Sequence, residues 1–174
     1  MSDFMDAVQV VIAHEGGFSD HASDRGGETS YGISQAFLNS IGSNLRAREV
    51  TKAKAIELYL EFFWLPLNIG RISDQDVATF VLDSAVNHGN STAAKILQEA
   101  INVQKPIVID GVIGDQTIGA CNDILSLEKG KEFLLDSLQS IRKSYYMKIV
   151  ASKPDQRVFI RGWFNRVNDL VNHG

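Results

Sequence analysis

Apolar residues recur at helical spacing along most of this chain, and this periodicity limits what the chain can fold into. The pattern begins near Phe4, and its longest run extends from about residue 128 to 151. A pattern typical of strands occurs only around residues 16–34 and in a short piece at 106–109. The sequence therefore predicts a mainly α fold with a short β or loop region after the first helix.

The chain is long enough for one good core, or for one core with a small appended part. It has 174 residues, 44% of them hydrophobic, and a lone Cys121 that excludes an internal disulfide. No internal repeat or long linker divides it. We predict two parts, residues 1–90 and residues 91–174, packed into the same globular body and held together by burial.

Glu15 lies where the first helix is expected to end, because Gly16-Gly17 follows it directly. The negative end of a helix macrodipole repels an ionised carboxylate and favours the protonated form. A protonated carboxyl group is what a general acid requires. The alternative is an ordinary helix end, in which Glu15 has no chemical role.

Two segments around this position carry a family resemblance. Residues 15–20, Glu-Gly-Gly-Phe-Ser-Asp, and residues 26–34, Gly-Gly-Glu-Thr-Ser-Tyr-Gly-Ile-Ser, resemble the opening signature of glycoside hydrolase family 108. The resemblance implies a lysozyme-like helical fold and a peptidoglycan N-acetylmuramidase of the phage-lysin or secretion-associated type. The closing segment from Gly162 to Arg166 is also similar to that family.

The second half resembles a different element of cell-wall proteins. Residues 110–117, Asp-Gly-Val-Ile-Gly-Asp-Gln-Thr, resemble the turn of helical peptidoglycan-binding modules, with Leu97-Gln98 at the usual upstream place. We expect these residues to be mainly structural. The resemblance implies that residues 91–174 form a helical, peptidoglycan-binding-like part.

Cleavage of a glycosidic bond requires one carboxylic acid and one carboxylate. Glu15 is the predicted acid for cleavage between N-acetylmuramic acid and N-acetylglucosamine. Asp24 is the leading second carboxylate, because a polar loop would keep it ionised. Asp20 and Glu28 remain alternatives for this role.

A hydroxyl group completes the predicted catalytic set. The looser phage-type lysozyme pattern, which Glu15 and Asp24 also resemble, aligns its threonine with Ser30, whereas the threonine here is the neighbouring Thr29. Either hydroxyl is a candidate to hold a water molecule with Asp24. Inversion would follow if that water lies opposite Glu15, at a carboxyl separation of roughly 6.5–9.5 Å, whereas roughly 5–5.5 Å would favour retention.

Further residues are predicted to contact the saccharide. An aromatic face can stack on a sugar ring, and polar groups at a helix end can border a groove. Core packing is the alternative for Trp64, and capping of a helix end is the alternative for Asn87 and His88. The predicted substrate-binding residues are Asp20, Glu28, Tyr31, Trp64, Asn87 and His88.

Two expectations concern packing. Asp83 lies among apolar residues, so it should have a cationic partner, and Arg161 or Arg166 is the candidate. Gly162 is expected to allow the close approach of another helix.

Charge and spacing exclude several functions. The net charge of −4 with scattered basic residues argues against a nucleic-acid partner. His14, Glu15 and His21 lack the spacing of a zinc-protease helix, so neither metal nor cofactor is expected. No apolar stretch approaches the length of a membrane span, and no signal peptide is recognised at Met1.

We therefore expect a monomer made in the cytoplasm that acts on peptidoglycan in the periplasm or outside after release. The alternative is a non-catalytic peptidoglycan-binding or secretion-assisting protein.

Overall fold

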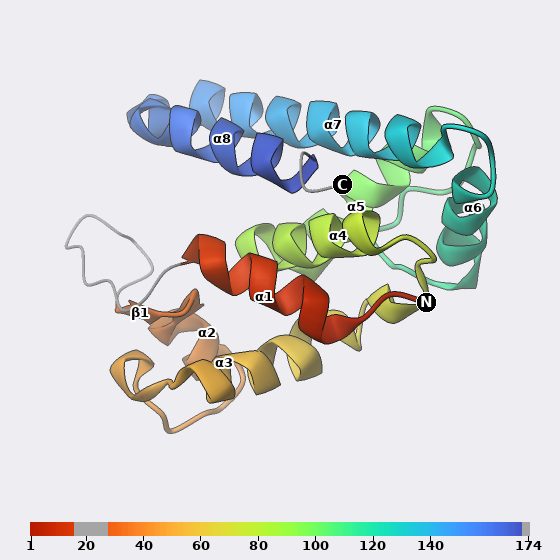
Figure 1. The fold of residues 1–174 in the computed structure, drawn as a ribbon. Coiled ribbons are helices and arrows are strands. Elements are labelled where there is room, and N and C mark those ends of the chain that lie inside the picture. The colour runs from red at the N-terminus through yellow and green to blue at the C-terminus, as the bar shows by residue number, and fades with distance from the viewer. Residues whose placement is uncertain (16–27, 172–174) are drawn as a thin grey trace.

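A computed structural model describes residues 1–15 and 28–171 and shows a mainly helical protein, which confirms the predicted fold class (Figure 1). The α-helices are α1 (Phe4–Glu15), α2 (Gln35–Ser40), α3 (Lys52–Tyr59), α4 (Gln75–His88), α5 (Asn90–Asn102), α6 (Asp115–Leu125), α7 (Gly130–Ser152) and α8 (Ile160–Val171). Shorter helical turns are η1 (Ala47–Glu49), η2 (Leu60–Trp64), η3 (Ile69–Arg71) and η4 (Pro154–Phe159). Strands β1 (Thr29–Ser30) and β2 (Ile33–Ser34) form a small antiparallel hairpin.

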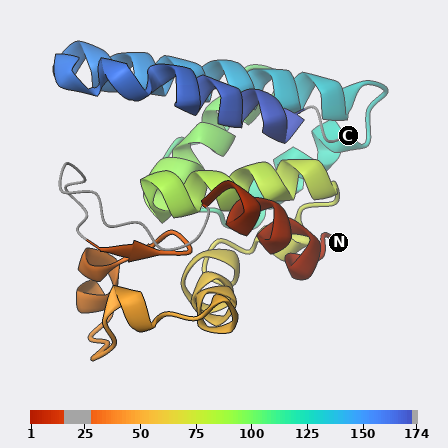
Figure 2. The ribbon, with the colours of Figure 1, turned by 60° about the vertical axis from the view of Figure 1, so that its left-hand side comes forward.

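Helix α4 is the centre of the molecule. Its residues from Val77 to Ala85 are all buried, and it packs against α1, α5, α7 and α8. The antiparallel pair α7 and α8 lies on one side of α1 and α4, and the hairpin, α2 and α3 lie on the other (Figures 1 and 2). Elements from both ends of the chain therefore meet on the same central helix.

Side-chain caps fix where several helices begin. The Ser34 hydroxyl accepts a hydrogen bond from the Phe37 amide at 3.1 Å, and Thr51 accepts one from the Lys54 amide at 3.2 Å. Asp74 caps α4 by accepting from the first amides of that helix. Each cap satisfies an amide that has no partner inside its own helix.

Trp64 lies in the core and does not line a groove. Helix α3 continues through the π-helical turn η2, where the Leu65 amide donates to the Leu60 carbonyl at 3.0 Å. This turn places the Trp64 ring against Phe4, with the ring centroids 5.5 Å apart, and leaves only 6% of Trp64 exposed. A ring this buried cannot stack on a sugar, so the core alternative is favoured over substrate binding.

The turn between α5 and α6 is built around Gln98. This buried side chain donates to Asp110 Oδ1 at 2.8 Å and accepts from the Gly111 amide at 2.8 Å. Gly111 has a φ of +80°, and a Cβ atom there would lie 2.6 Å from Ser91 Oγ. The bonding agrees with a mainly structural role for this turn.

Gly162 does not have the expected packing role. A Cβ atom at this position would meet nothing within 4 Å, so no helix approaches it closely. Gly130 at the start of α7 does mark a close approach of two helices, because a Cβ atom there would clash with the Ile124 carbonyl oxygen of α6. Among the described helices, none is long and apolar enough to cross a membrane.

Candidate active site

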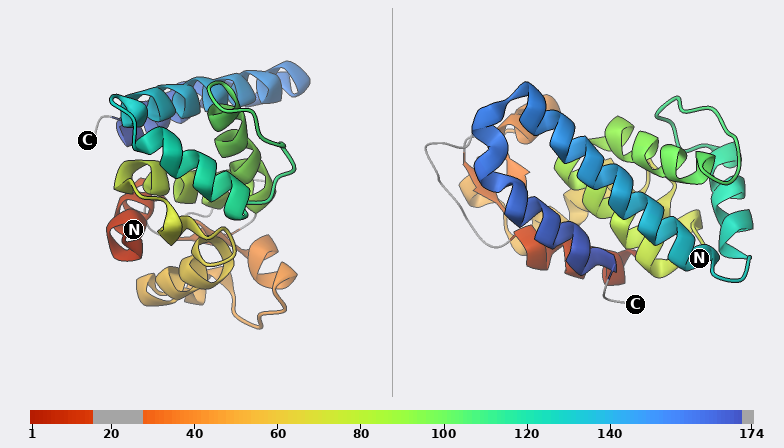
Figure 3. Two further views of the ribbon diagram at one scale, coloured as in Figure 1. Left: turned by 90° about the vertical axis from the view of Figure 1, so that its right-hand side faces the viewer. Right: turned by 90° about the horizontal axis from the view of Figure 1, so that it is seen from above.

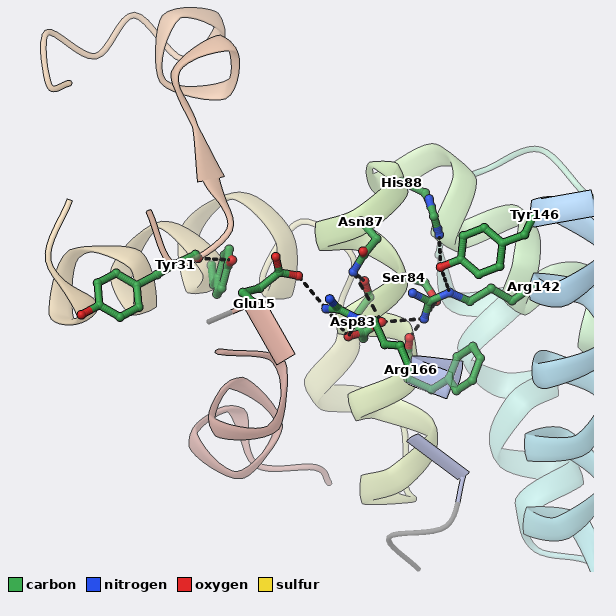
Figure 4. Close-up of polar contacts among 11 residues, drawn as sticks. Glu15, Tyr31, Asp83, Ser84, Asn87, His88, Arg142, Tyr146 and Arg166 are labelled. Carbon is green, nitrogen blue, oxygen red and sulfur yellow. Dashed lines mark hydrogen bonds and ion pairs between the residues drawn. The ribbon is translucent and has the colours of Figure 1, made fainter. Parts of the chain in front are cut away.

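Glu15, the last residue of α1, is held by a residue from the far end of the chain. Arg166 of α8 donates through Nη2 to Glu15 Oε1 at 2.6 Å (Figure 4). The side chain of Glu15 is 17% exposed, and that of Arg166 is 14% exposed. One edge of the carboxyl group is therefore fixed while part of the group still reaches the surface.

The same arginine also binds Asp83, which is completely buried in α4. Arg166 donates to Asp83 Oδ2 through Nε at 2.8 Å and through Nη2 at 2.6 Å. On the other side, Arg142 of α7 lies 2.6 Å from Asp83 Oδ1. The expectation of a cationic partner for Asp83 is confirmed, with Arg166 as the predicted partner and Arg142 as a second one.

Two arginines decide the charge state of this buried carboxyl group. Burial alone would raise the pKa of Asp83, but the charges of Arg142 and Arg166 outweigh it and hold the pKa below its ordinary value. Burial likewise disfavours the charge on Arg166, yet Asp83 and Glu15 raise its pKa above the ordinary value. Asp83 therefore acts as the fixed counter-ion that orients Arg166 toward Glu15.

The network continues from Arg142 to the end of α4. Arg142 donates through Nε to the Tyr146 hydroxyl at 3.1 Å, and that hydroxyl lies 3.1 Å from His88 Nε2. Arg142 also donates to Ser84 Oγ at 3.3 Å. Burial, with the charge of Arg142, lowers the pKa of His88 to about 3, so this imidazole is neutral near pH 7. His88 is thus a part of the buried network, and Figure 4 shows it on the far side of Asp83 from Glu15.

The backbone of the β-hairpin passes directly over Glu15. Gly32 has a φ of +74°, and a Cβ atom there would lie 2.7 Å from Glu15 Cγ and 2.4 Å from the Tyr59 hydroxyl. That hydroxyl donates to the Tyr31 carbonyl oxygen at 2.6 Å. Burial, with the nearby Glu15 charge, raises the pKa of Tyr59, so the phenol keeps its proton. Only a glycine can bring the turn this close to the candidate acid.

The two hydroxyl candidates in β1 have different surroundings. Ser30 is 3% exposed and donates through Oγ to the Val50 carbonyl oxygen at 3.1 Å. This contact anchors the hairpin to the segment after η1, a structural role. Thr29 is only partly buried, and successive residues of a strand point to opposite faces. The Thr29 side chain therefore lies on the opposite face of the strand from that of Ser30.

The remaining predicted residues that the structure describes do not form one cluster. Asn87 is exposed and donates to the Asp83 carbonyl oxygen at 2.8 Å, so it stays close to the network. Tyr31 lies in the hairpin and Glu28 beside it, and both are partly buried. Asp20 and Asp24 lie outside the described residues.

Sequence reasoning missed Arg142, Tyr146 and Tyr59. Arg142 could have been noticed in the sequence, because it is a charged residue at helical spacing from Leu135 and Leu138 on the buried face of α7. A charged residue at such a position requires a buried partner of opposite charge, and Asp83 likewise requires a cation. Tyr59 left no such signal, since an aromatic residue on an apolar helix face is typical of a core.

The arrangement supplies a positioned carboxyl group and no metal site. Among the residues described, no group of three or more His, Cys, Asp or Glu side chains lies together in a way that would hold a metal ion. Glu15 combines partial exposure with a fixed counter-ion and a close glycine turn. The structure therefore holds this carboxyl group in a defined position.

Comparisons with known proteins identify the families that the two halves of the chain match. Residues 8–89 match the family model described as Glycosyl hydrolase 108, and residues 92–168 match the model described as Predicted Peptidoglycan domain. The structure of SagA from Brucella abortus is similar, with a TM-score of 0.80 and 26% sequence identity over 98% of this chain and 92% of that chain. A comparison with curated proteins finds no match.

The fold is thus that of a glycosidase-type protein with a peptidoglycan-related function. Residues 8–89 belong to glycosyl hydrolase family 108, and residues 92–168 match a peptidoglycan domain. Peptidoglycan is accordingly its partner.

Proposed function

We propose that this protein hydrolyses the β-1,4 bond between N-acetylmuramic acid and N-acetylglucosamine in peptidoglycan, with Glu15 as the general acid. The observation that carries the proposal is the position of Glu15. It is fixed by Arg166 on one side, covered by the Gly32 turn on another, and still partly exposed. A general acid requires this combination of fixed geometry and access to the leaving oxygen.

Asp24 is the proposed second carboxylate, and Thr29 is the proposed hydroxyl that would hold a water molecule with it. Thr29 starts the hairpin that covers Glu15, and Asp24 precedes it by five positions in the sequence. The support for Asp24 is its match to the lysozyme pattern. Glu28 is the alternative carboxylate, since it adjoins β1 directly.

The ion pair with Arg166 adds one requirement to this mechanism. A general acid must carry a proton, whereas Glu15 forms its ion pair as a carboxylate. Glu15 must therefore take up a proton and loosen its contact with Arg166 when the substrate binds. Arg166 would keep its place during this step because it retains both bonds to Asp83.

The same ion pair supports a second candidate function. A carboxylate that stays bound to Arg166 accepts hydrogen bonds and does not donate a proton. In that case the protein would bind peptidoglycan without cutting it, as a wall-binding or secretion-assisting protein. We propose that in either role it acts on the wall in the periplasm or outside the cell, as a monomer.

Loss of turbidity of a peptidoglycan suspension distinguishes the two functions. Glu15→Gln removes the proton donor with little change in shape, so the rate of clearing should fall about 10²- to 10⁴-fold. Glu57→Gln is the matched control, because Glu57 pairs with Lys54 on the surface and its side chain is 65% exposed. Binding without clearing in the wild-type protein would favour the non-catalytic role.

A further inference from the structure

A groove between α5 and α7 has no role in the site described above. It lies on the flank of α7 that faces α5, whereas α8, which carries Arg166, lies along the other flank (Figure 3, right). Its volume is about 490 Å³, within the range of about 300–1,000 Å³ common for ligand pockets. A shallower hollow of about 230 Å³ continues from it past Ser140 and Ile141 to Val103 and Asp136.

The two helices that line the groove, α5 and α7, run antiparallel, so each end of the groove combines the end of one helix with the start of the other. Val103 follows the end of α5, yet it shares a hollow with Asp136 from the first half of α7. At the opposite end, Tyr145 of α7 contacts His88, which precedes α5, with ring centroids 5.0 Å apart. This second end is the one nearer the Asp83 network and Glu15.

Charge is distributed unevenly along the groove. Lys95 and Lys148 line the end that adjoins His88, and both are exposed. Neither lysine forms an ion pair with any residue in the described ranges. Glu99 lies one helical turn beyond Lys95, and Asp136 lies in the hollow at the far end. The groove thus offers two free cations at one end and carboxylates farther along.

The part of the groove between the lysines and the carboxylates has an apolar floor and a hydroxyl group, which would suit an extended peptide. Ile96 is 3% exposed and forms an apolar floor with Ile141. Ser144 donates its hydroxyl to the Ser140 carbonyl oxygen at 2.9 Å, which leaves its lone pairs free to accept from a ligand N–H group. Apolar area with a few polar groups is typical of a small-molecule or peptide site.

We propose that this groove binds the peptide stem of peptidoglycan. The stem carries free carboxylates near the sugar and, farther along, a diamino acid with a free amine. Lys95 and Lys148 would bind the carboxylates, and Glu99 with Asp136 would bind the amine. A glycan strand alone presents few charges, so it would make little use of free ammonium groups. This inference rests on the proposed function, because both require peptidoglycan as the ligand.

Binding of a synthetic stem peptide to the full-length Glu15→Gln variant tests the proposal. Peptide titration followed by NMR should give saturable shifts in residues 92–99 and 140–148. Lys95→Ala and Lys148→Ala should each weaken binding about two- to fivefold, as expected for an exposed ion pair. Lys143→Ala is the matched control on α7, because its Nζ atom lies 5.8 Å from the centre of the Phe164 ring, outside the groove.

A second comparison tests the direction of binding. Acetylation of the peptide amine should weaken binding to the parent protein, and Glu99→Gln should reduce that difference. The proposal is overturned if the peptide shows no saturable binding, if Lys143→Ala weakens binding as much as Lys95→Ala, or if peptide-free glycan strands depend on the same lysines.

These outcomes are separable from a failure of the proposed function. Peptide binding together with no fragment release by the wild-type protein would refute hydrolysis and retain the groove. Fragment release with no peptide binding would retain hydrolysis and refute the groove.

Discussion

At the scale of single residues, the site depends on a glycine that only the three-dimensional structure explains. Gly32→Ala would place a methyl group 2.7 Å from Glu15 Cγ on a backbone with a φ of +74°. Something must shift, so we expect a loss of hydrolytic activity greater than the loss of stability. Steady-state assays with thermal unfolding of the same samples measure both quantities.

The matched control for this change is Gly42→Ala. Gly42 has a similar φ of +69°, but a Cβ atom there meets nothing within 4 Å. The free energy of unfolding of this variant should fall by only about 1–2 kcal/mol, because alanine is disfavoured in the left-handed region. Its activity should be unchanged. Equal activity of the two variants would show that the Gly32 turn does not control Glu15.

At the scale of elements, α8 joins the end of α1 to the centre of α4 through one side chain. Arg166→Met would remove the partner of Glu15 and one of the two cations on buried Asp83. We expect a loss of about 3–5 kcal/mol in the free energy of unfolding, because the remaining charge is undercompensated. Arg166→Lys should lose less stability but still reduce kcat, since an ammonium group lacks the fork that reaches both carboxylates.

Arg161→Met is the control on the same helix, because Arg161 is exposed and belongs to no ion pair in the described residues. Denaturant unfolding and turnover of peptidoglycan would be measured for all three variants. If Arg166→Met were as stable and as active as Arg161→Met, the ion-pair network would have no part in holding Glu15.

At the scale of the whole molecule, the buried network makes stability depend on pH. His88 has a pKa of about 3 in the folded state, against about 6.5 in an unfolded chain. Between these values the unfolded state binds the additional proton, so the free energy of unfolding falls as the pH decreases from about 6.5 toward 3. The slope is at most about 1.4 kcal/mol per pH unit. Asp83, whose pKa is lowered, adds its own loss only at more acidic pH, below the unfolded value of about 3.9.

His88→Gln should flatten this dependence between pH 6.5 and 4. Urea unfolding at several pH values would measure the slopes. Parallel curves for the wild-type and His88→Gln proteins would contradict a neutral, buried His88.

How far the sequence predicts this molecule depends on whether a feature is local. Helical spacing and caps such as Ser34 and Thr51 are local, so the mainly α fold followed from them. The need of Asp83 for a cation was visible, because a charge among apolar residues requires a partner. The joint use of Arg166 by Asp83 and Glu15 was not visible, since 151 positions separate Arg166 from Glu15. The sequence left Trp64 open between the two roles, because an aromatic residue has the same pattern in a core as beside a cleft.

The most direct test of the central claim is mass spectrometry of the soluble fragments released from purified peptidoglycan. The account predicts fragments with N-acetylmuramic acid at the reducing end from the wild-type protein, and almost none from a folded Glu15→Gln variant. Fragments ending in reducing N-acetylglucosamine would place the cut at the other linkage. No release by a folded wild-type protein would contradict the claim that Glu15 serves a hydrolase.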